Sequence, residues 1–224
     1  TSCRGPLLKR EGEFLNFCFS SPKKPVVAIV GGSKVSSKLG VLENLANRVD
    51  SLIVGGGIAN TFLVAANKDV GKSLYEKQLV DRARAIMDKV EVILPSDVVV
   101  STEISDKSVA LKKLVDDIGP DEMVLDIGIS SSERVSKILE ASGTIIWNGP
   151  VGVFEIEQFS EGTKSVSAAV SESGAFSIAG GGDTLAAIEK YKISKNISYI
   201  STGGGAFLKF LENGRLPAID ILNQ

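Results

Sequence analysis

Short apolar segments rich in β-branched residues alternate with amphipathic segments along most of the chain. The apolar segments do not alternate strictly with polar residues, which is typical of strands covered on both faces. The amphipathic segments repeat their apolar residues at helical spacing. The expected strands are 25–30, 51–54, 90–94, 122–127, 143–147, 175–179 and 197–201, and the expected helices are 35–48, 76–89, 131–142, 162–173, 184–191 and 205–212.

This alternation predicts right-handed βαβ units. The expected fold class is therefore α/β, a Rossmann-like open parallel sheet of about six strands with helices on both faces. Segment 96–120 breaks the rhythm, and we expect a hairpin-like excursion at the sheet edge before a helix that contains Leu111 and Leu114. Residues 6–21 predict a further helix that ends before Pro22 and docks outside the sheet.

Four of the expected strands end in a glycine cluster that a helix follows. Such loops lie at the carboxyl edge of a parallel sheet, where ligands bind. Glycines let backbone N–H groups approach a ligand, and a helix N-terminus favours phosphate. A single cluster is equally well read as a tight turn, but four in one sheet indicate a phosphate site. The four stretches are 30–38, 54–62, 179–187 and 202–210.

Two named phosphate motifs fail in this sequence. The stretch "GKS" at 71–73 imitates the end of a Walker loop, but Ala66 stands where that loop requires glycine. The dinucleotide fingerprint G-x-G-x-x-G fails in the three glycine triplets, because Asn60, Leu185 and Leu208 occupy the position of the third glycine. A nicotinamide cofactor is therefore disfavoured.

Lys34 and Lys38 in the first loop are four residues apart. A helix that begins near Val35 would place both ammonium groups on one face of its first turn. Because a helix N-terminus is already positive, an anion between the two lysines would relieve the conflict. The alternative is a pair of solvated surface lysines.

Asp183 and Thr184 follow the third glycine cluster. Asp183 fits a helix N-cap, and it also fits a ligand of Mg²⁺ shared with nucleotide phosphates, because a carboxylate beside phosphate needs a cation between them. In the stretch 146–159, Pro150 and Val153 suit an apolar wall for a base and Glu155 suits a ribose. A structural turn around a buried Trp147 explains the same stretch, and the local sequence does not decide between the two.

Composition narrows the function classes. The chain has 224 residues, 43% of them hydrophobic and 23% charged, with a formal net charge of −2. This balance is typical of a soluble globular protein and argues against one that coats nucleic acid or an anionic membrane. No histidine is present, which removes serine–histidine and histidine–metal chemistry. The longest apolar stretch, 51–66, is too short to span a bilayer. Cys3 and Cys18 form no disulfide framework, which is typical of a reducing compartment, so we expect a cytoplasmic protein.

The chain resembles the C-terminal, nucleotide-binding half of phosphoglycerate kinases over nearly its whole length. The stretches that carry the resemblance are "AIVGGSKVSSK", "LIVGGGIANTF", "LDIG", "WNGPVGVFE", "GGGDT" and "STGGGAFLKFLE", in the order and at the spacing of the family. The resemblance implies phosphoryl transfer between 1,3-bisphosphoglycerate and Mg-ADP, giving 3-phosphoglycerate and ATP, in a glycolytic enzyme that is monomeric at full length. A carboxylate acceptor carries no proton to remove, so such an enzyme needs positioning and charge neutralisation rather than a base.

The resemblance also implies a role for each matching residue. Lys34 would stabilise the phosphoryl group in flight, Lys38 would bind the nucleotide phosphates and Asp183 would hold Mg²⁺. The other implied positions are Gly182, Gly203, Gly204 and Gly205 as catalytic backbone donors, Gly32, Ser33, Asn148, Gly181 and Thr184 near the phosphates, Glu155 at the ribose, and Gly57, Leu125, Pro150 and Val153 around the adenine.

Two departures from the family pattern matter. The family follows the "LDIG" glycine with proline, whereas this chain has Ile129, which predicts a less rigid loop. The family also has an N-terminal domain that binds phosphoglycerate and supplies an arginine, and nothing in these residues corresponds to it. We expect residues 1–24 to form the interdomain helix and linker and 25–224 the nucleotide-binding C-terminal domain.

We therefore expect the chain alone to bind ADP or ATP with Mg²⁺ and to turn over negligibly. Phosphoglycerate would bind through the missing domain. The alternatives are a nicotinamide-dinucleotide-binding domain of a dehydrogenase and a non-catalytic adenylate-binding module.

Overall fold

The computed structural model describes residues 21–213. The helix expected over 6–21 falls outside these residues except for its last position, as does most of the segment 1–24 expected to link two domains.

The main sheet is open and entirely parallel, with the order β3-β2-β1-β7-β8-β9. This arrangement confirms the predicted fold class, and the strands lie within one residue or two of the expected ranges. The strands are β1 (Val26–Val30), β2 (Ser51–Val54), β3 (Glu91–Ile93), β7 (Thr144–Asn148), β8 (Phe176–Gly180) and β9 (Tyr199–Ser201).

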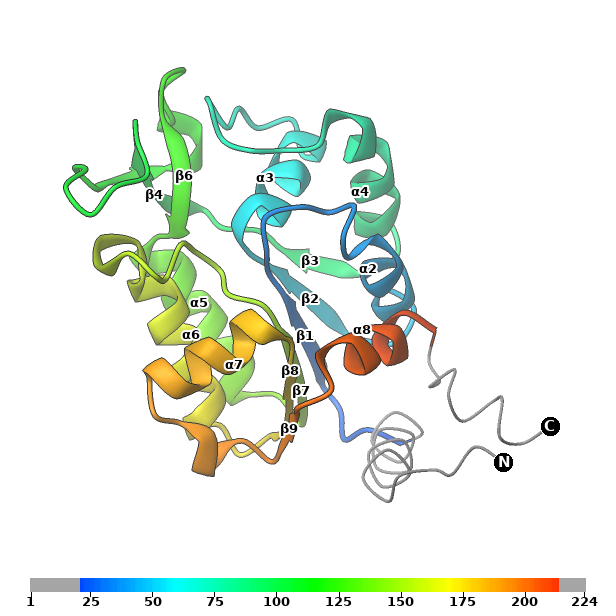
Figure 1. The fold of residues 1–224 in the computed structure, drawn as a ribbon. Coiled ribbons are helices and arrows are strands. Elements are labelled where there is room, and N and C mark those ends of the chain that lie inside the picture. Colours follow the sequence, from blue (N-terminus) through cyan, green and yellow to red (C-terminus); the bar gives the residue numbers. More distant parts are fainter. Residues whose placement is uncertain (1–20, 214–224) are drawn as a thin grey trace, which may run out of the picture.

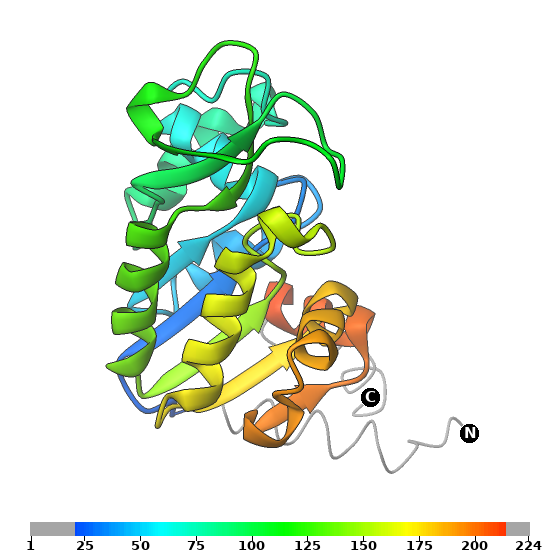
Figure 2. The ribbon, with the colours of Figure 1, turned by 90° about the vertical axis from the view of Figure 1, so that its left-hand side faces the viewer.

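Helices cover both faces of this sheet, so the molecule has three layers (Figure 1). One core cluster joins the sheet to α2, α3, α4 and α8, and a second cluster joins the opposite face to α5, α6 and α7. Figure 2 views the molecule from the side of α5 and α6, which lie across the strands. The helices are α2 (Leu39–Leu45), α3 (Gly56–Ala65), α4 (Val80–Met87), α5 (Ile129–Glu140), α6 (Glu161–Glu172), α7 (Gly182–Lys190) and α8 (Gly204–Asn213).

Strand β1 is buried on both faces, which explains why its sequence does not alternate between apolar and polar residues. Val26, Ala28 and Val30 pack in the first cluster, while Val27 and Ile29 pack in the second. Each of the five side chains is at most 2% exposed. Both faces of a central parallel strand need apolar residues, as the continuous apolar run predicted.

A separate antiparallel sheet has the order β5-β4-β6 and lies beyond the carboxyl ends of the main strands (Figure 1). Its strands are β4 (Asp97–Ser101), β5 (Leu111–Leu114) and β6 (Met123–Ile127). The hairpin expected after residue 96 is present as β4 and β5, but it belongs to this separate sheet and does not lie at the edge of the parallel one. Two further expectations were wrong. Segment 122–127 pairs with β4 and does not join the parallel sheet, and Leu111 and Leu114 lie on a strand instead of a helix.

The spacing of Leu111 and Leu114 was misleading because neither side chain belongs to a core. They are 45% and 60% exposed, and β5 is held by its pairing with β4, in which Val100 faces Leu111 and Asp97 faces Leu114. Four short 3-10 helices complete the described elements: η1 (Lys77–Leu79), η2 (Val115–Asp117), η3 (Glu157–Phe159) and η4 (Ser194–Asn196).

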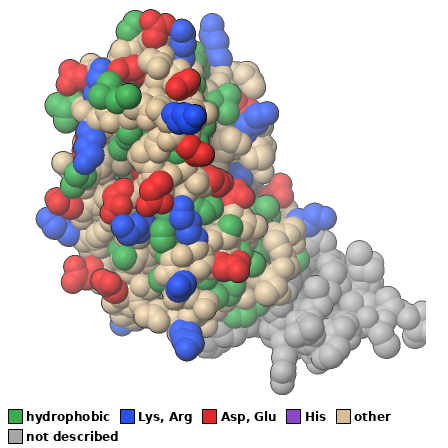
Figure 3. All heavy atoms as spheres, turned by 60° about the vertical axis from the view of Figure 1, so that its left-hand side comes forward, with side chains coloured by type: hydrophobic (Ala, Val, Ile, Leu, Met, Phe, Trp, Pro, Cys, Tyr) green, Lys and Arg blue, Asp and Glu red, His purple; other side chains and the backbone are tan. Residues whose placement is uncertain are grey.

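On the face shown in Figure 3, acidic and basic side chains are interspersed among small apolar groups. None of the helices within residues 21–213 has the length and apolar composition needed to cross a bilayer.

Candidate functional site

The connection order of the parallel sheet changes direction between β1 and β7, which are hydrogen-bonded neighbours. At such a switch point the loops after the two strands diverge, and ligands bind in the crevice they leave. The loop after β1 remains joined to β7 here, because Gly31 N–H donates to the Asn148 carbonyl at 3.0 Å. The predicted first loop and the "WNGPVGVFE" stretch therefore meet at one place.

Lys38 lies across this junction. Its Nζ donates to the carbonyl oxygens of Gly31 at 2.6 Å and Asn148 at 3.1 Å. Burial lowers the pKa of Lys38 to about 8, and the nearby Asp183 carboxylate acts in the opposite direction. A cation in a partly desolvated position with few compensating charges is well suited to an incoming anion.

The expected alignment of Lys34 and Lys38 on one helix was wrong. Helix α2 begins at Leu39, and Lys38 has non-helical backbone angles of φ −131° and ψ 12°. The Lys38 N–H closes a turn onto the Val35 carbonyl at 2.9 Å, with the Val35 side chain fully buried beneath it. Lys38 therefore reaches back toward the strand ends, while Lys34 is exposed on the same loop.

Several glycines are required by packing between loops. A Cβ on Gly31 would lie 1.7 Å from the Pro150 carbonyl oxygen, and one on Gly57 would lie 2.1 Å from the Ser33 carbonyl oxygen. Gly55 has the same constraint against Val151. The first two glycine clusters thus allow three loops to pack closely together. This packing requires glycine whether or not a ligand binds.

Other glycines have open space where a side chain would project. A Cβ on Gly182, Gly204 or Gly205 would meet nothing within 4 Å, whereas one on Gly180 would lie 2.4 Å from the ring of Phe207. Gly182 and Gly204 are the first residues of α7 and α8. These open backbones at helix N-termini are the positions where N–H groups face a ligand most directly.

Asn148 and Thr184 join β7 to the start of α7. Asn148 Nδ2 donates to the Gly180 carbonyl at 2.7 Å, and Asn148 Oδ1 is buried without a partner. The fully buried Thr184 hydroxyl donates to the same carbonyl at 2.9 Å and accepts the Gly149 N–H at 2.7 Å. The hydroxyl is thus already engaged, so a phosphate at this position would be bound by backbone N–H groups.

Asp183 is not the N-cap of its helix. Gly181, with φ 101°, occupies that position, and Asp183 is the second helical residue. Its carboxylate interacts favourably with the helix dipole and borders the cavity described next. Asp183 is therefore available for a cation in the cavity.

A cavity of about 390 Å³ opens between the carboxyl edge of the main sheet and β6, within the size range of small-molecule sites. Eight residues predicted for the site border it: Gly32, Ser33, Gly57, Leu125, Pro150, Val153, Glu155 and Asp183. The other predicted residues are not part of this lining: Lys34, Lys38, Asn148, Gly181, Gly182, Thr184, Gly203, Gly204 and Gly205.

The structural interpretation of the 146–159 stretch is confirmed, and some residues of the same stretch also border the cavity. Trp147 is fully buried and its Nε1 donates to the Gly149 carbonyl at 3.0 Å, which shapes the turn. Val153 N–H donates to the Leu125 carbonyl at 2.8 Å, which fixes the outer part of the turn to β6. The contact between Trp147 and Gly149 thus shapes the start of the turn, and residues from Pro150 onward border the cavity.

Sequence reasoning missed several residues around the cavity. Leu74 and Ile104 border it from loops without a recognisable motif, and they are 53% and 56% exposed. Exposed apolar residues in loops do not repeat at helix or strand spacing, so a hydrophobic pattern does not reveal them. The remaining lining residues that were missed are Gly56, Asn60, Met123, Val124 and Gly152.

Asp126, behind the cavity, was also missed. The side chain is 1% exposed and accepts hydrogen bonds from the N–H groups of Ile127 at 2.9 Å and Gly162 at 2.7 Å. Burial raises the pKa of Asp126 to about 7. A carboxylate inside the apolar run "MVLDI" was the available signal, since buried acids need a specific partner.

The "GKS" stretch, which fails to match a Walker loop, makes structural contacts. Gly71 has φ 57°, Lys72 pairs with the exposed Asp121, and the Ser73 hydroxyl accepts the Val124 N–H at 2.8 Å. These contacts attach the 70–76 loop to β6.

An open parallel sheet with glycine loops and a cavity at its switch point defines a Rossmann-like α/β protein with a candidate ligand site at the carboxyl edge. The sequence model of phosphoglycerate kinase matches residues 1–214. The chain belongs to the phosphoglycerate kinase family.

Solved structures agree with this assignment. The chain is similar to phosphoglycerate kinase from Coxiella burnetii, with 51% sequence identity and a TM-score of 0.94 over 98% of this chain and 58% of that one. It is also similar to phosphoglycerate kinase from Pyrococcus horikoshii OT3, with 34% identity and a TM-score of 0.85 over 98% of this chain and 56% of that one. The chain thus spans a little under three-fifths of the length of each.

Proposed function

We propose that residues 25–224 form the nucleotide-binding half of a phosphoglycerate kinase and bind ADP or ATP together with Mg²⁺. The observation that carries the proposal is the cavity itself, because eight residues from separate motifs border it. The Lys38 ammonium lies at the strand ends, where burial lowers its pKa and the Asp183 carboxylate is close enough to oppose that lowering.

The cavity lining and the residues near it at the carboxyl edge of the sheet would supply different chemistry. Leu125, Pro150 and Val153 supply apolar surface for the adenine, and the exposed Glu155 supplies a carboxylate for ribose hydroxyls. Lys38 neutralises phosphate charge, and the open backbone at Gly182 supplies N–H donors. Lys34 and the 203–205 loop act on the transferring group.

The residues present fit a magnesium ion that arrives with the nucleotide. Within residues 21–213, no three His, Cys, Asp or Glu side chains gather into a group able to hold a metal. Mg²⁺ commonly takes one or two protein carboxylates and completes its shell with substrate phosphates and water. Asp183, in the first turn of α7 and on the cavity wall, would hold the ion, which would neutralise charge on the phosphates.

The proposed reaction is phosphoryl transfer between 1,3-bisphosphoglycerate and Mg-ADP, with a carboxyl group as the acceptor in the reverse direction. Its chemistry depends on positioning and charge neutralisation in a site that excludes water. A polypeptide of these 224 residues supplies the nucleotide side of that site. Tested alone, it should bind nucleotide and turn over negligibly.

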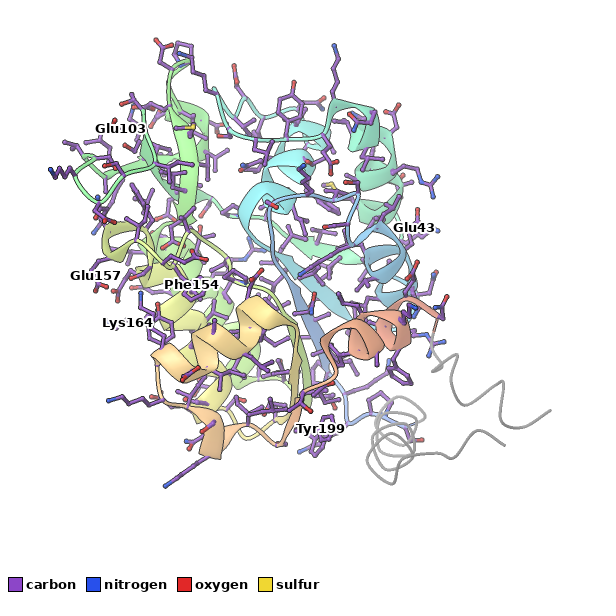
Figure 4. The ribbon with its side chains drawn as sticks, in the orientation of Figure 1. Glu43, Glu103, Phe154, Glu157, Lys164 and Tyr199 are labelled. Carbon is purple, nitrogen blue, oxygen red and sulfur yellow. The ribbon has the colours of Figure 1, made fainter. Side chains whose placement is uncertain are left out.

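Calorimetry of the chain with ADP, in the presence and absence of Mg²⁺, tests the proposal. Lys38→Met should weaken Mg-ADP binding by about 10- to 100-fold, the range expected for losing a hydrogen bond to a charged group. Asp183→Asn should remove most of the Mg²⁺ dependence. Lys164→Met is the matched control, because Lys164, labelled in Figure 4, is exposed and its ion-pair partner is Glu161 on the same helix, α6.

Each competing function predicts a different result. Tighter binding of NAD than of Mg-ADP would favour the dehydrogenase domain and reject the proposal. Activity that appears only after addition of a separately prepared phosphoglycerate-binding half would exclude a non-catalytic module. Rapid ATP formation by the chain alone would contradict the expected inactivity.

A further inference from the structure

Gln158 joins two segments that border the cavity. It lies in η3, and its Nε2 donates to the carbonyl oxygens of Ser105 at 3.0 Å and Ser108 at 2.9 Å. The amide nitrogen has two hydrogens, so both donors are used. In Figure 4, Glu103 and Glu157 mark the two segments, which lie side by side also in Figures 1 and 2.

The two accepting carbonyls are the ends of one tight turn. Ser108 N–H donates to the Ser105 carbonyl at 3.1 Å, and the Ser108 hydroxyl donates to the same oxygen at 2.7 Å. In the described structure, the other hydrogen bonds given for residues 102–110 join residues only two apart. Gln158 therefore fixes the position of the turn relative to the rest of the molecule.

The backbone that carries Gln158 is itself firmly packed. Its neighbour Phe159 is fully buried in a cluster with Val99 and Leu125, and Val153 packs against the same cluster. Val153 and the exposed Glu155 belong to the segment that ends in η3. The side chain of Gln158 thus extends from a firmly packed segment to the neighbouring 105–108 turn.

Ile104 directly precedes the turn that Gln158 holds. It borders the cavity and is 56% exposed. A large apolar side chain in this position gains burial when a flat, partly apolar ligand enters the cavity. That gain depends on the turn staying in place, because an unrestrained loop would pay ordering entropy on binding.

We infer that Gln158 is a positioning residue, which holds the 105–108 turn so that Ile104 covers the base of the bound nucleotide. The inference deepens the proposed function and rests on it. Gln158 acts through Ile104 and does not need to touch the ligand.

A double-mutant cycle measured by calorimetry with Mg-ADP tests this role. Gln158→Ala should weaken binding about three- to tenfold, corresponding to the loss of one or two neutral hydrogen bonds. Gln158→Glu should have at least the same effect, because the carboxylate keeps the shape but cannot donate. In an Ile104→Ala background, Gln158→Ala should change the affinity less than twofold. Glu157→Gln, an exposed neighbour in η3, is the matched control and should bind as the wild type does.

Two further measurements separate positioning from stability. Thermal melting should show all variants folded, and hydrogen exchange of the Ser108 amide should be faster in both Gln158 variants. Wild-type affinity in Gln158→Ala, or an equal loss with and without Ile104, would reject the inference and leave the nucleotide site standing. A wild-type chain that does not bind Mg-ADP would reject both.

Discussion

Oδ2 of Asp126 accepts a 2.7 Å hydrogen bond from the N–H of Gly162, which ties the end of β6 to the first turn of α6. Desolvation by burial raises the pKa of Asp126 to about 7, although the Gly162 and Ile127 N–H groups act in the opposite direction and the nearby Glu161 adds to the rise. The native protein thus keeps a proton on Asp126 up to about pH 7, whereas the unfolded chain releases this proton near pH 4. This carboxyl group couples the stability of the cavity wall to pH.

Asp126→Asn should flatten the pH dependence of stability. Because the folded pKa is raised, the contribution of this group is fully present below about pH 4 and is lost as pH rises through about 7. Between pH 5 and pH 8 the wild type should therefore lose about 2–3 kcal/mol relative to the variant. Urea unfolding at the two pH values measures the difference, and parallel pH profiles would contradict it.

Gly152→Ala should destabilise the fold by about 1–3 kcal/mol, the usual cost of overpacking a close contact. An added Cβ would lie 2.1 Å from Oδ1 of Asp126. Gly174→Ala is the matched control, because a Cβ there would meet nothing within 4 Å. Urea midpoints measure both changes. The cost of Gly152→Ala should shrink in an Asp126→Ala background, and an unchanged cost would show that another contact is responsible.

Ile129→Pro should raise the free energy of unfolding by about 0.4–1 kcal/mol, by restricting the unfolded chain. Ile129 is the first residue of α5, where proline fits, and Gly128 before it has the extended ψ of −179° that a following proline requires. This corrects the expectation of a loop before residue 131. The Ser130 and Ser131 N–H groups are already bound by Asp97.

Ser130→Pro is the contrasting variant for this prediction. It would remove the 3.0 Å hydrogen bond from Ser130 N–H to Asp97 and disfavour the helical conformation of Ile129. It should therefore lower the melting temperature, whereas Ile129→Pro should raise it. A decrease with both prolines would show that Ile129 is not the first residue of α5.

The affinity for Mg-ADP should fall above pH 8 if Lys38 binds the phosphates. Burial lowers the pKa of Lys38 to about 8, so its charge is lost as pH rises through that value. Calorimetry should give binding about tenfold weaker at pH 9.5 than at pH 7.5. Lys38→Arg keeps its charge over this range and should show a much weaker pH dependence. Equal pH profiles for the two proteins would remove Lys38 from the site.

The sequence predicted those features that depend on local pattern. Continuous apolar runs such as β1 identified the buried parallel strands, and the motifs identified loops whose residues meet at the cavity. Leu111 and Leu114 were misassigned because their spacing is shared by an exposed strand. The link from Gln158 to Ser105 joins segments 53 residues apart through an amide that carries no periodic signal. Such contacts depend on tertiary packing, which a single sequence does not display.

Gly205→Ala should separate the requirements of the fold from those of the ligand. Gly205 lies in the first turn of α8 with open space around a Cβ, so alanine should stabilise the helix by about 0.5–1 kcal/mol. If N–H groups of the 203–205 loop contact the transferring phosphoryl group, the added methyl group should weaken Mg-ATP binding more than Mg-ADP binding. Thermal melting and calorimetry measure the two effects.

Gly180→Ala provides the opposite case, because its Cβ would meet the Phe207 ring at 2.4 Å and should destabilise the protein by about 1–3 kcal/mol. If Gly205→Ala is stable but weakens the binding of Mg-ATP and Mg-ADP equally, the transferring phosphoryl group does not contact the 203–205 segment. A destabilised Gly205→Ala protein would instead show that this glycine is required by packing, as Gly180 is. Gly180 ends β8 and Gly205 lies in the first turn of α8, so their contrast separates a glycine required by packing from one whose open backbone serves a ligand.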